Sequence, residues 1–151
     1  MGNLACGCPG SMARVIERQE STETTTVKAA SELRQWPVQL HLVPPTAPYF
    51  QDADILVSAD CVAYAMGSMH QDLLKGKALA IACPKLDDTS AYVDKLALIF
   101  SANEIKSITV AIMEVPCCRG LDVMVKQALA QSGKDIPLES LIIGLDGERR
   151  N

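Results

Sequence analysis

Aromatic residues, long apolar runs and nucleotide-binding motifs are what this chain lacks. Aromatic side chains make up 4% of its 151 residues, so Val, Ile, Leu, Met and Ala must fill any interior. No run of about twenty apolar residues occurs, and we therefore expect no membrane-spanning helix and no membrane partner. The first residues also lack the apolar segment of a secretory signal, which predicts a cytoplasmic chain.

Excess positive charge is also missing. The formal net charge is -4, whereas a protein that neutralises nucleic-acid phosphates normally carries a basic surface, so we expect no nucleic-acid partner. Neither G-x-G-x-x-G nor G-x-x-x-x-G-K-[ST] occurs, and no G-x-S-x-G elbow is present. Nucleotide binding and serine hydrolysis therefore have no support from motifs.

Short apolar runs alternate with segments of helical spacing. Strands are expected over residues 38–43, 55–59, 78–82, 108–115 and 138–144, with a single helical turn at 47–52 and helices over 63–74 and 90–103. A further helix is expected between the fourth strand and Gly133, with Leu121, Met124, Val125, Ala128 and Leu129 on one face. Nearly continuous apolar strands are typical of a sheet that is buried on both faces. The pattern predicts an α/β fold with a mainly parallel sheet of about 4–5 strands and helices on both faces, in the Rossmann or flavodoxin manner.

The two ends of the chain have a different pattern. We expect residues 1–36 to form a cysteine-containing segment and a Thr-rich loop that pack on the main domain, and residues 37–151 to form one compact α/β unit. Within the first segment, residues 12–19 and 27–35 are predicted to be short helices, separated by a loop at 20–26. Residues 148–151 are expected to be a solvated tail.

Cysteines are the most informative residues in the chain. Four of the six follow apolar runs: Cys61, Cys83 and the tandem pair Cys117 and Cys118. The carboxyl ends of parallel strands meet at one edge of a sheet, so we expect these sulfurs to converge there. Iron–sulfur clusters commonly take four thiolates, and zinc also binds thiolates. Cys8 is a candidate fifth ligand, and whether Cys6 takes part stays open.

Two other uses of the cysteines compete with ligation. A free cysteine is often a small buried hydrophobe, and this is the alternative for each thiol taken singly. Disulfides are disfavoured because a βα pattern without a signal points to a reducing compartment. The α-carbons of Cys117 and Cys118 are also only about 3.8 Å apart, less than the usual disulfide range. Thiolate ligation is the use that the sequence favours for the set.

Charged residues near the predicted strand ends carry weaker signals. The pair Asp87–Asp88 is expected to cap the helix that begins near residue 90. Glu114 lies in an apolar strand, where a lone carboxylate is costly, so we expect it to pair with Arg119 or Lys85 or to orient a ligand. His70 is expected on the solvent-facing side of a helix.

Four segments resemble a known family: Gly-Cys-Pro-Gly-Ser at 7–11, Ala-Asp-Cys-Val-Ala at 59–63, Ile-Ala-Cys-Pro-Lys-Leu-Asp at 81–87 and Glu-Val-Pro-Cys-Cys-Arg-Gly-Leu at 114–121. They are similar to ferredoxin-related iron–sulfur proteins of anaerobic bacteria and archaea. In that family such a domain commonly follows a ferredoxin module with [4Fe-4S] clusters. This chain lacks the C-x-x-C-x-x-C-x-x-x-C-P run of that module, so any cluster must be held by the α/β domain itself.

The sequence thus leads to one main hypothesis and two alternatives. The main one is a [4Fe-4S]-type protein that transfers electrons to a ferredoxin or oxidoreductase in an anaerobe. The first alternative is a zinc-binding or thiol-based redox-sensing module that uses the same cysteines. The second is an enzyme whose cluster keeps an open coordination position, for which no catalytic residue stands out. A homodimer is left open.

Overall fold

Four parallel strands form the centre of the computed structural model, which describes residues 11–18 and 28–151. The strands are β1 (Ala53–Ala59), β2 (Lys77–Ala82), β3 (Ile105–Met113) and β4 (Leu138–Ile143), and the sheet order is β2-β1-β3-β4. Every residue from 55 to 59 and from 108 to 113 is buried, as the unbroken apolar runs require. The predicted α/β fold with a parallel sheet is confirmed.

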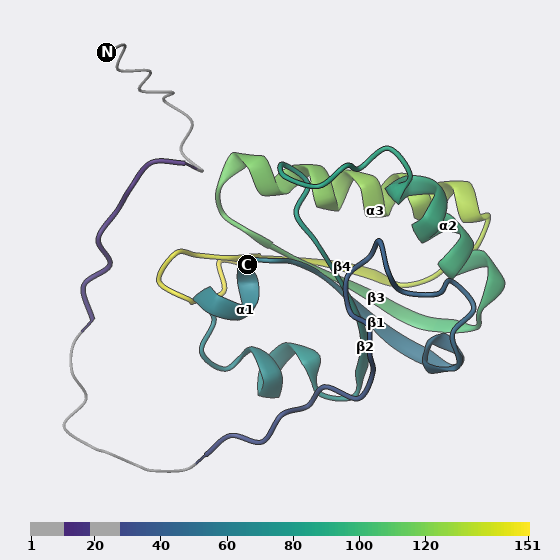
Figure 1. Cartoon of the computed structure of the whole chain (residues 1–151), viewed down its shortest axis with the longest axis horizontal. Helices are drawn as coiled ribbons and strands as arrows, with labels where there is room; N and C mark the ends of the chain where they lie inside the picture. The colour runs from purple at the N-terminus through teal and green to yellow at the C-terminus, as the bar shows by residue number, and fades with distance from the viewer. Residues whose placement is uncertain (1–10, 19–27) are drawn as a thin grey trace.

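Helices cover both faces of the sheet (Figure 1). Helices α2 (Tyr92–Ala102) and α3 (Arg119–Ser132) lie side by side on one face. The short α1 (Val62–Ala65) and the single π-helical turn η2 (His70–Leu74) lie on the other. Two further turns are 3₁₀-helical, η1 (Pro48–Phe50) and η3 (Pro116–Cys118), and η1 confirms the predicted helical turn at 47–52.

The few aromatic side chains occupy central places in the core. Phe50, Phe100 and Tyr92 have no exposed surface, and they fill space among the aliphatic residues of the sheet. Gly133 ends α3 in a left-handed conformation with φ of 70°, which glycine adopts without strain. The predicted end of that helix is therefore confirmed.

The strand predicted at 38–43 is wrong. Only Gln39 makes a bridge, to Ile81 of β2, and the chain then turns as the N–H groups of Leu42 and Val43 bond the Gln39 carbonyl at 2.8 and 3.0 Å. The Gln35 side chain extends this short contact, because its amide donates to the Leu79 carbonyl at 2.7 Å and accepts from the Leu79 N–H at 2.8 Å. The Gln35 side chain thus satisfies backbone groups at the outer edge of β2 that a fifth strand would otherwise bond.

Three predicted helices are also corrected. Residues 12–18 and 28–35 are not helical, and almost all of them are exposed; a short helix without a face to bury is marginal in water. Residues 19–27 lie outside the described part of the chain. The helix expected at 63–74 is divided into α1 and η2, because Met66 takes an extended conformation with ψ of 106°.

Residues 148–151 are all exposed, as predicted for a solvated tail, and they also lie along the outer edge of β4. The Arg150 N–H bonds the Ile142 carbonyl at 2.8 Å, and the Asn151 side chain bonds the Ile142 N–H at 3.0 Å and the Ser140 carbonyl at 2.9 Å. Both outer strands are therefore covered, β2 by Gln35 and β4 by Asn151. The division of the chain at residue 36 stays a prediction.

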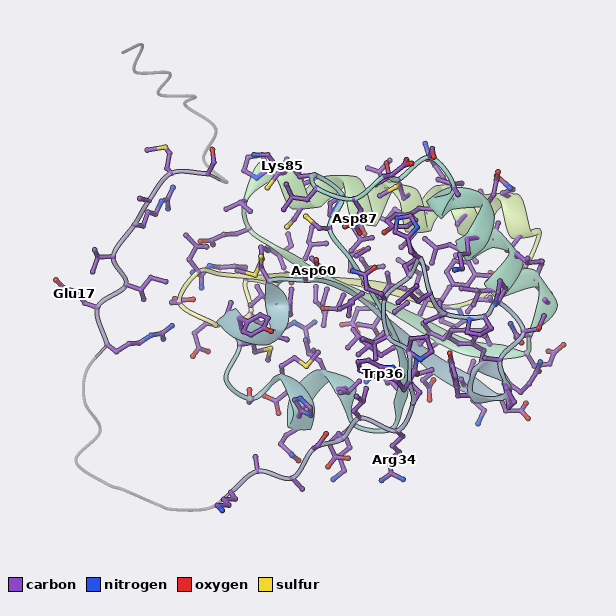
Figure 2. The ribbon with its side chains drawn as sticks, viewed as in Figure 1. Glu17, Arg34, Trp36, Asp60, Lys85 and Asp87 are labelled. Atoms are coloured by element: carbon purple, nitrogen blue, oxygen red, sulfur yellow. The ribbon has the colours of Figure 1, made fainter. Side chains whose placement is uncertain are left out.

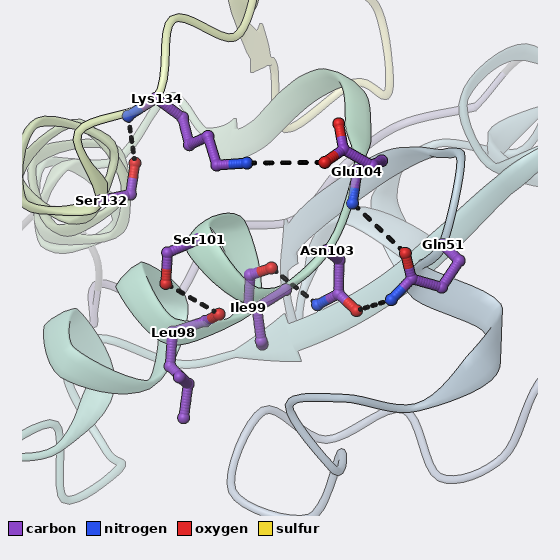
Figure 3. Close-up of polar contacts among 8 residues, drawn as sticks. All are labelled: Gln51, Leu98, Ile99, Ser101, Asn103, Glu104, Ser132 and Lys134. Atoms are coloured by element: carbon purple, nitrogen blue, oxygen red, sulfur yellow. Dashed lines mark hydrogen bonds and ion pairs between the residues drawn. The ribbon is translucent and has the colours of Figure 1, made fainter.

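A buried amide closes the amino end of the sheet (Figure 3). Asn103 is 2% exposed, donates to the carbonyls of Ile99 at 2.7 Å and Pro45 at 2.8 Å, and accepts from the Gln51 side chain at 2.7 Å. Gln51 in turn accepts from the Glu104 N–H at 3.4 Å. The segments before β1 and β3 are thereby tied together at this end.

Candidate functional site

The sheet has a topological switch point between its two central strands, β1 and β3. The chain continues from β1 to β2, which lies on one side of this central pair, and from β3 to β4, which lies on the other side. Open α/β sheets bind ligands in the crevice at such a switch point. Cys61 follows β1, and the tandem Cys117 and Cys118 follow β3. These cysteines therefore flank the position where this fold places ligands.

Direct contacts join the three loops that carry the cysteines. The Asp60 N–H bonds the carbonyl of Ala82 at 3.1 Å, so the residues that immediately precede Cys61 and Cys83 are tied together. A Cβ added to Gly120 would lie 3.4 Å from the Pro84 Cβ. The loop after β2 therefore touches the first turn of α3, directly beyond the tandem pair.

The four thiols influence one another electrostatically. Burial raises the pKa of Cys118 to about 11; a backbone hydrogen bond from Met113 opposes this rise, and negative charge at Cys117, Cys61 and Cys83 adds to it. Burial also raises the pKa of Cys61, and charge at Cys83 and Cys117 adds to that rise. The loops that carry the cysteines are thus neighbours at one edge of the sheet, while the convergence of the four sulfurs on one ligand stays a prediction.

The cysteines differ in their exposure to solvent. Cys61 is exposed, Cys83 and Cys117 are half-buried, and Cys118 is 7% exposed and packs with the core. Within residues 11–18 and 28–151, no three His, Cys, Asp or Glu side chains are gathered into a ready-made metal-binding group. The candidate fifth ligand Cys8, like Cys6, lies outside the described residues.

Asp87 organises the Cys83 loop. Its carboxylate accepts from the Cys83 N–H at 2.9 Å and from the Tyr92 hydroxyl, and the Leu86 N–H points at the Cys83 sulfur at 3.4 Å. Burial raises the pKa of Tyr92, and the hydrogen bond to Asp87 raises it further. These bonds hold the loop in a fixed turn around the sulfur.

The capping role predicted for Asp87–Asp88 is therefore corrected. Helix α2 begins without a side-chain cap, and Asp88 bonds the Ser90 N–H at 3.1 Å before the helix starts. Asp87 faces the cysteine loop because the turn from 83 to 87 closes on itself, with the Asp87 N–H bonding the Cys83 carbonyl at 3.0 Å.

Asp60 is a site residue that sequence reasoning missed. Burial raises the pKa of its carboxyl group, and the charge on Asp87 raises it further. Its Oδ1 atom is buried without a hydrogen-bond partner among the described residues. Figure 2 shows Asp60 at this edge, below Lys85 and Asp87. Its position between a buried strand and a cysteine was the signal available in the sequence.

Glu114 has other partners than those predicted. It accepts from the Leu145 N–H at 3.2 Å and pairs with Arg150 at 3.0 Å, and not with Arg119 or Lys85. The Leu145 hydrogen bond, followed by that of Arg150, lowers the pKa of its carboxyl group. Arg150 also pairs with Asp146 at 3.0 Å. Glu114 thus anchors the carboxyl-terminal tail next to the loop of the tandem cysteines.

Comparisons with known proteins agree with this architecture. A family model described as a Rossmann-like domain matches residues 47–150. A protein of Archaeoglobus fulgidus, described as an uncharacterized protein, is 34% identical over 116 residues, which cover 77% of this chain and 81% of the relative. No solved structure matches the chain closely enough to count as similar. No helix in the described ranges is long and apolar enough to cross a membrane.

Proposed function

This chain belongs to the Rossmann-like domain family, and from that premise we propose that it binds an iron–sulfur cluster of [4Fe-4S] type through Cys61, Cys83, Cys117 and Cys118. The observation that supports the proposal is that the three loops carrying these cysteines are in contact at the carboxyl edge of the sheet, beside its switch point. Rossmann-like domains hold their ligands at this edge.

The donor set suits a cluster. Four thiolates are the number that a [4Fe-4S] cluster takes, and Cys118 and Cys61 would lie on its inner and outer sides, since one is buried and the other exposed. The 14-residue helix α3 begins directly after the tandem pair. The positive end of its dipole stabilises anionic sulfur. Because burial raises the pKa of Cys118, binding must release protons and becomes weaker in acid.

Electron transfer is the role that we propose for the bound group. A cluster supplies one-electron redox chemistry, and the chain holds it, shields it and presents it to a partner. Tyr64 and Leu86 are 93% and 83% exposed and lie close in sequence to Cys61 and Cys83. Large exposed apolar side chains beside a site are typical of protein contact surfaces. We therefore propose a ferredoxin or an oxidoreductase as the redox partner.

Metal analysis separates the proposal from its alternatives. Anaerobic purification, or reconstitution with ferrous iron and sulfide, is expected to give a brown protein with about four iron and four sulfide per chain. A zinc or thiol redox module would contain zinc, or no metal, and no acid-labile sulfide. An anaerobic preparation that stays colourless and cannot be reconstituted rejects the proposal.

Variants identify the ligands. Cys61→Ser changes an exposed residue, so we expect it to lose most of the iron while the metal-free protein unfolds at the same temperature. The unaltered chain, reconstituted in parallel, is the reference. Cys8→Ser and Cys6→Ser then show whether a further thiolate contributes. Iron in Cys61→Ser equal to that of the unaltered chain would exclude Cys61 as a ligand.

A further inference from the structure

A groove lies at the amino edge of the sheet, at the end of the strands opposite the cysteines. Its volume is about 490 Å³, and it is bordered by the residues that lead into β1 and β2 and by part of the segment 28–38, which we name the strap. β1 has seven residues, and a strand rises by about 3.3 Å per residue, so about 20 Å separate this amino-edge groove from the cysteine edge. The groove is therefore distinct from the proposed cluster site.

Three cationic side chains line the amino-edge groove, Arg34 of the strap and the two lysines on either side of Gly76, Lys75 and Lys77. Arg34 and Lys75 are exposed. Within residues 11–18 and 28–151, none of the three forms an ion pair with a carboxylate. Lys77 donates to the Leu73 carbonyl at 3.0 Å, and its ammonium group has two further donors. All three cations can therefore reach a ligand in the groove.

The other polar side chains of the groove leave this positive charge in excess. Asp52 supplies the one carboxylate of the lining, so three cations and one anion give the groove a net charge of +2. The amides of Gln35 and Gln51 are bonded elsewhere in the fold, and the Tyr49 hydroxyl oxygen is buried away from the groove surface. The whole chain carries -4. Local charge of the opposite sign concentrates anions at such a place.

Hydrogen bonds hold the strap beside the turn that carries the lysines (Figure 1). The Glu32 N–H donates to His70 Nδ1 at 3.0 Å, and the Gln71 side chain donates to the Ala30 carbonyl at 3.2 Å. The Lys75 N–H bonds the His70 carbonyl at 2.9 Å, so one turn fixes both the strap and the first lysine. His70 is half-buried there, which corrects its predicted solvent-facing position.

The backbone between the two lysines is open to a ligand. Gly76 has a φ of 75°, and a Cβ added there would meet no atom within 4 Å. Its N–H makes no backbone hydrogen bond in the described part of the chain. Backbone N–H groups beside cationic side chains are typical of phosphate and carboxylate sites. Gly76 thus adds a donor to the charges on either side of it.

We propose that the amino-edge groove binds a small dianion, a molecule with a phosphoryl group or two carboxylates, through Arg34, Lys75 and Lys77. Two negative charges neutralise the local charge of +2, and a guanidinium group binds phosphate and carboxylate alike. A volume of about 490 Å³ lies in the range of small-molecule sites, about 300–1,000 Å³. A nucleic acid does not fit, because the chain as a whole repels it. The site does not require the proposed cluster.

Succinate, succinamide and inorganic phosphate are the probes, since the first two share a carbon skeleton and differ in charge. Nuclear magnetic resonance titration of the full chain, prepared anaerobically at pH 8 and constant ionic strength, should show millimolar binding of at least one dianion. The amide signal of Gly76 should shift, and succinamide should leave it unchanged. The dianion that binds more tightly identifies the anionic group. No shift with either dianion, or an equal shift with succinamide, overturns the proposal.

Three variants locate the site. Lys75→Gln and Arg34→Gln each remove one exposed cation and should weaken binding of the tighter dianion about threefold to tenfold. Lys126→Gln is the matched control, because it removes the same charge from α3, on the far face of the sheet, and it should bind as the unaltered chain does. Equal weakening in Lys75→Gln and Lys126→Gln would show that overall charge, and not the groove, attracts the anion.

Iron content separates this proposal from the cluster. It should be the same in all three variants as in the unaltered chain, because the groove and the cysteines lie at opposite edges of the sheet. A chain that holds no iron but binds the dianion would reject the cluster and support the groove. A chain that holds iron but binds neither dianion would do the reverse.

Discussion

Cys118 and Cys61 follow strands of the same sheet but meet different surroundings. Cys118 is buried and its pKa is raised to about 11, whereas Cys61 is exposed to solvent. A thiol with that pKa is only about 0.1% thiolate at pH 8. The two thiols therefore differ in burial and in protonation in the metal-free protein.

Alkylation rates test this difference. In the metal-free, reduced protein at pH 8, iodoacetamide should modify Cys61 many times faster than Cys118, because Cys118 is both buried and almost fully protonated. Peptide mass spectrometry over time gives the rate for each cysteine. In urea, where both residues are exposed, the two rates should become similar. A native Cys118 that reacts as fast as Cys61 would contradict its buried position.

At the scale of elements, side-chain hydrogen bonds and ion pairs connect segments that the hydrogen bonds of the sheet do not connect. Asn103 ties the end of α2 to the segments before β1, and Glu114 ties the end of β3 to the tail through Arg150. One junction is buried and the other is largely exposed. Their contributions to stability should therefore differ in size and in pH dependence.

Asn103→Ala should destabilise the protein by about 2–4 kcal/mol, because it leaves the Pro45 carbonyl and the Gln51 amide without their buried partner. Denaturant unfolding measures the change in the free energy of unfolding. The matched control is Ser101→Ala, which removes an exposed hydroxyl that bonds the Leu98 carbonyl at 3.3 Å (Figure 3). The control should change stability by less than about 0.5 kcal/mol.

Glu114 should make stability depend on pH. Its folded pKa lies below the ordinary value of 4.5, so its contribution is fully present above that value and is lost as the pH falls through the folded pKa. Glu114→Gln should therefore lower the unfolding temperature at pH 7, and the difference from the unaltered chain should shrink below about pH 4.

Thermal unfolding at both pH values checks the Glu114 prediction. Glu148→Gln is the matched control, since it removes one negative charge from the same tail but leaves the bonds of Glu114 to Leu145 and Arg150 in place. A difference between Glu114→Gln and the unaltered chain that persists unchanged in acid would show that charge at Glu114 is not its cause.

At the scale of the whole molecule, the sheet in the described part of the chain has four strands, and both outer ones are protected. Exposed strand edges promote pairing between chains. Here the Gln35 amide covers β2, and Asn151 with the tail backbone covers β4. Residues before β1 and residues after β4 thus cover the two outer edges of the sheet.

Gln35→Ala should expose the part of the β2 edge at Leu79 and remove two hydrogen bonds to that residue, at a cost of about 1–3 kcal/mol. We also expect it to aggregate at a lower temperature, which light scattering during heating measures. Arg34→Ala, a change at the adjacent exposed residue (Figure 2), is the control and should behave like the unaltered chain. Equal scattering in both variants would show that Gln35 does not protect the edge.

The sequence by itself determined the parallel sheet, the helices α2 and α3, and the edge at which Cys61, Cys83 and the tandem pair lie. Apolar runs and helical spacing are local patterns, and the direction of parallel strands follows from their connections. Only the tertiary structure decided that residues 38–43 do not form a strand, that Asp87 bonds the Cys83 loop and that Glu114 meets Arg150. Hydrogen bonds and ion pairs between segments that are distant in sequence depend on how the whole chain folds. Residues that are adjacent in sequence therefore do not reveal these partners.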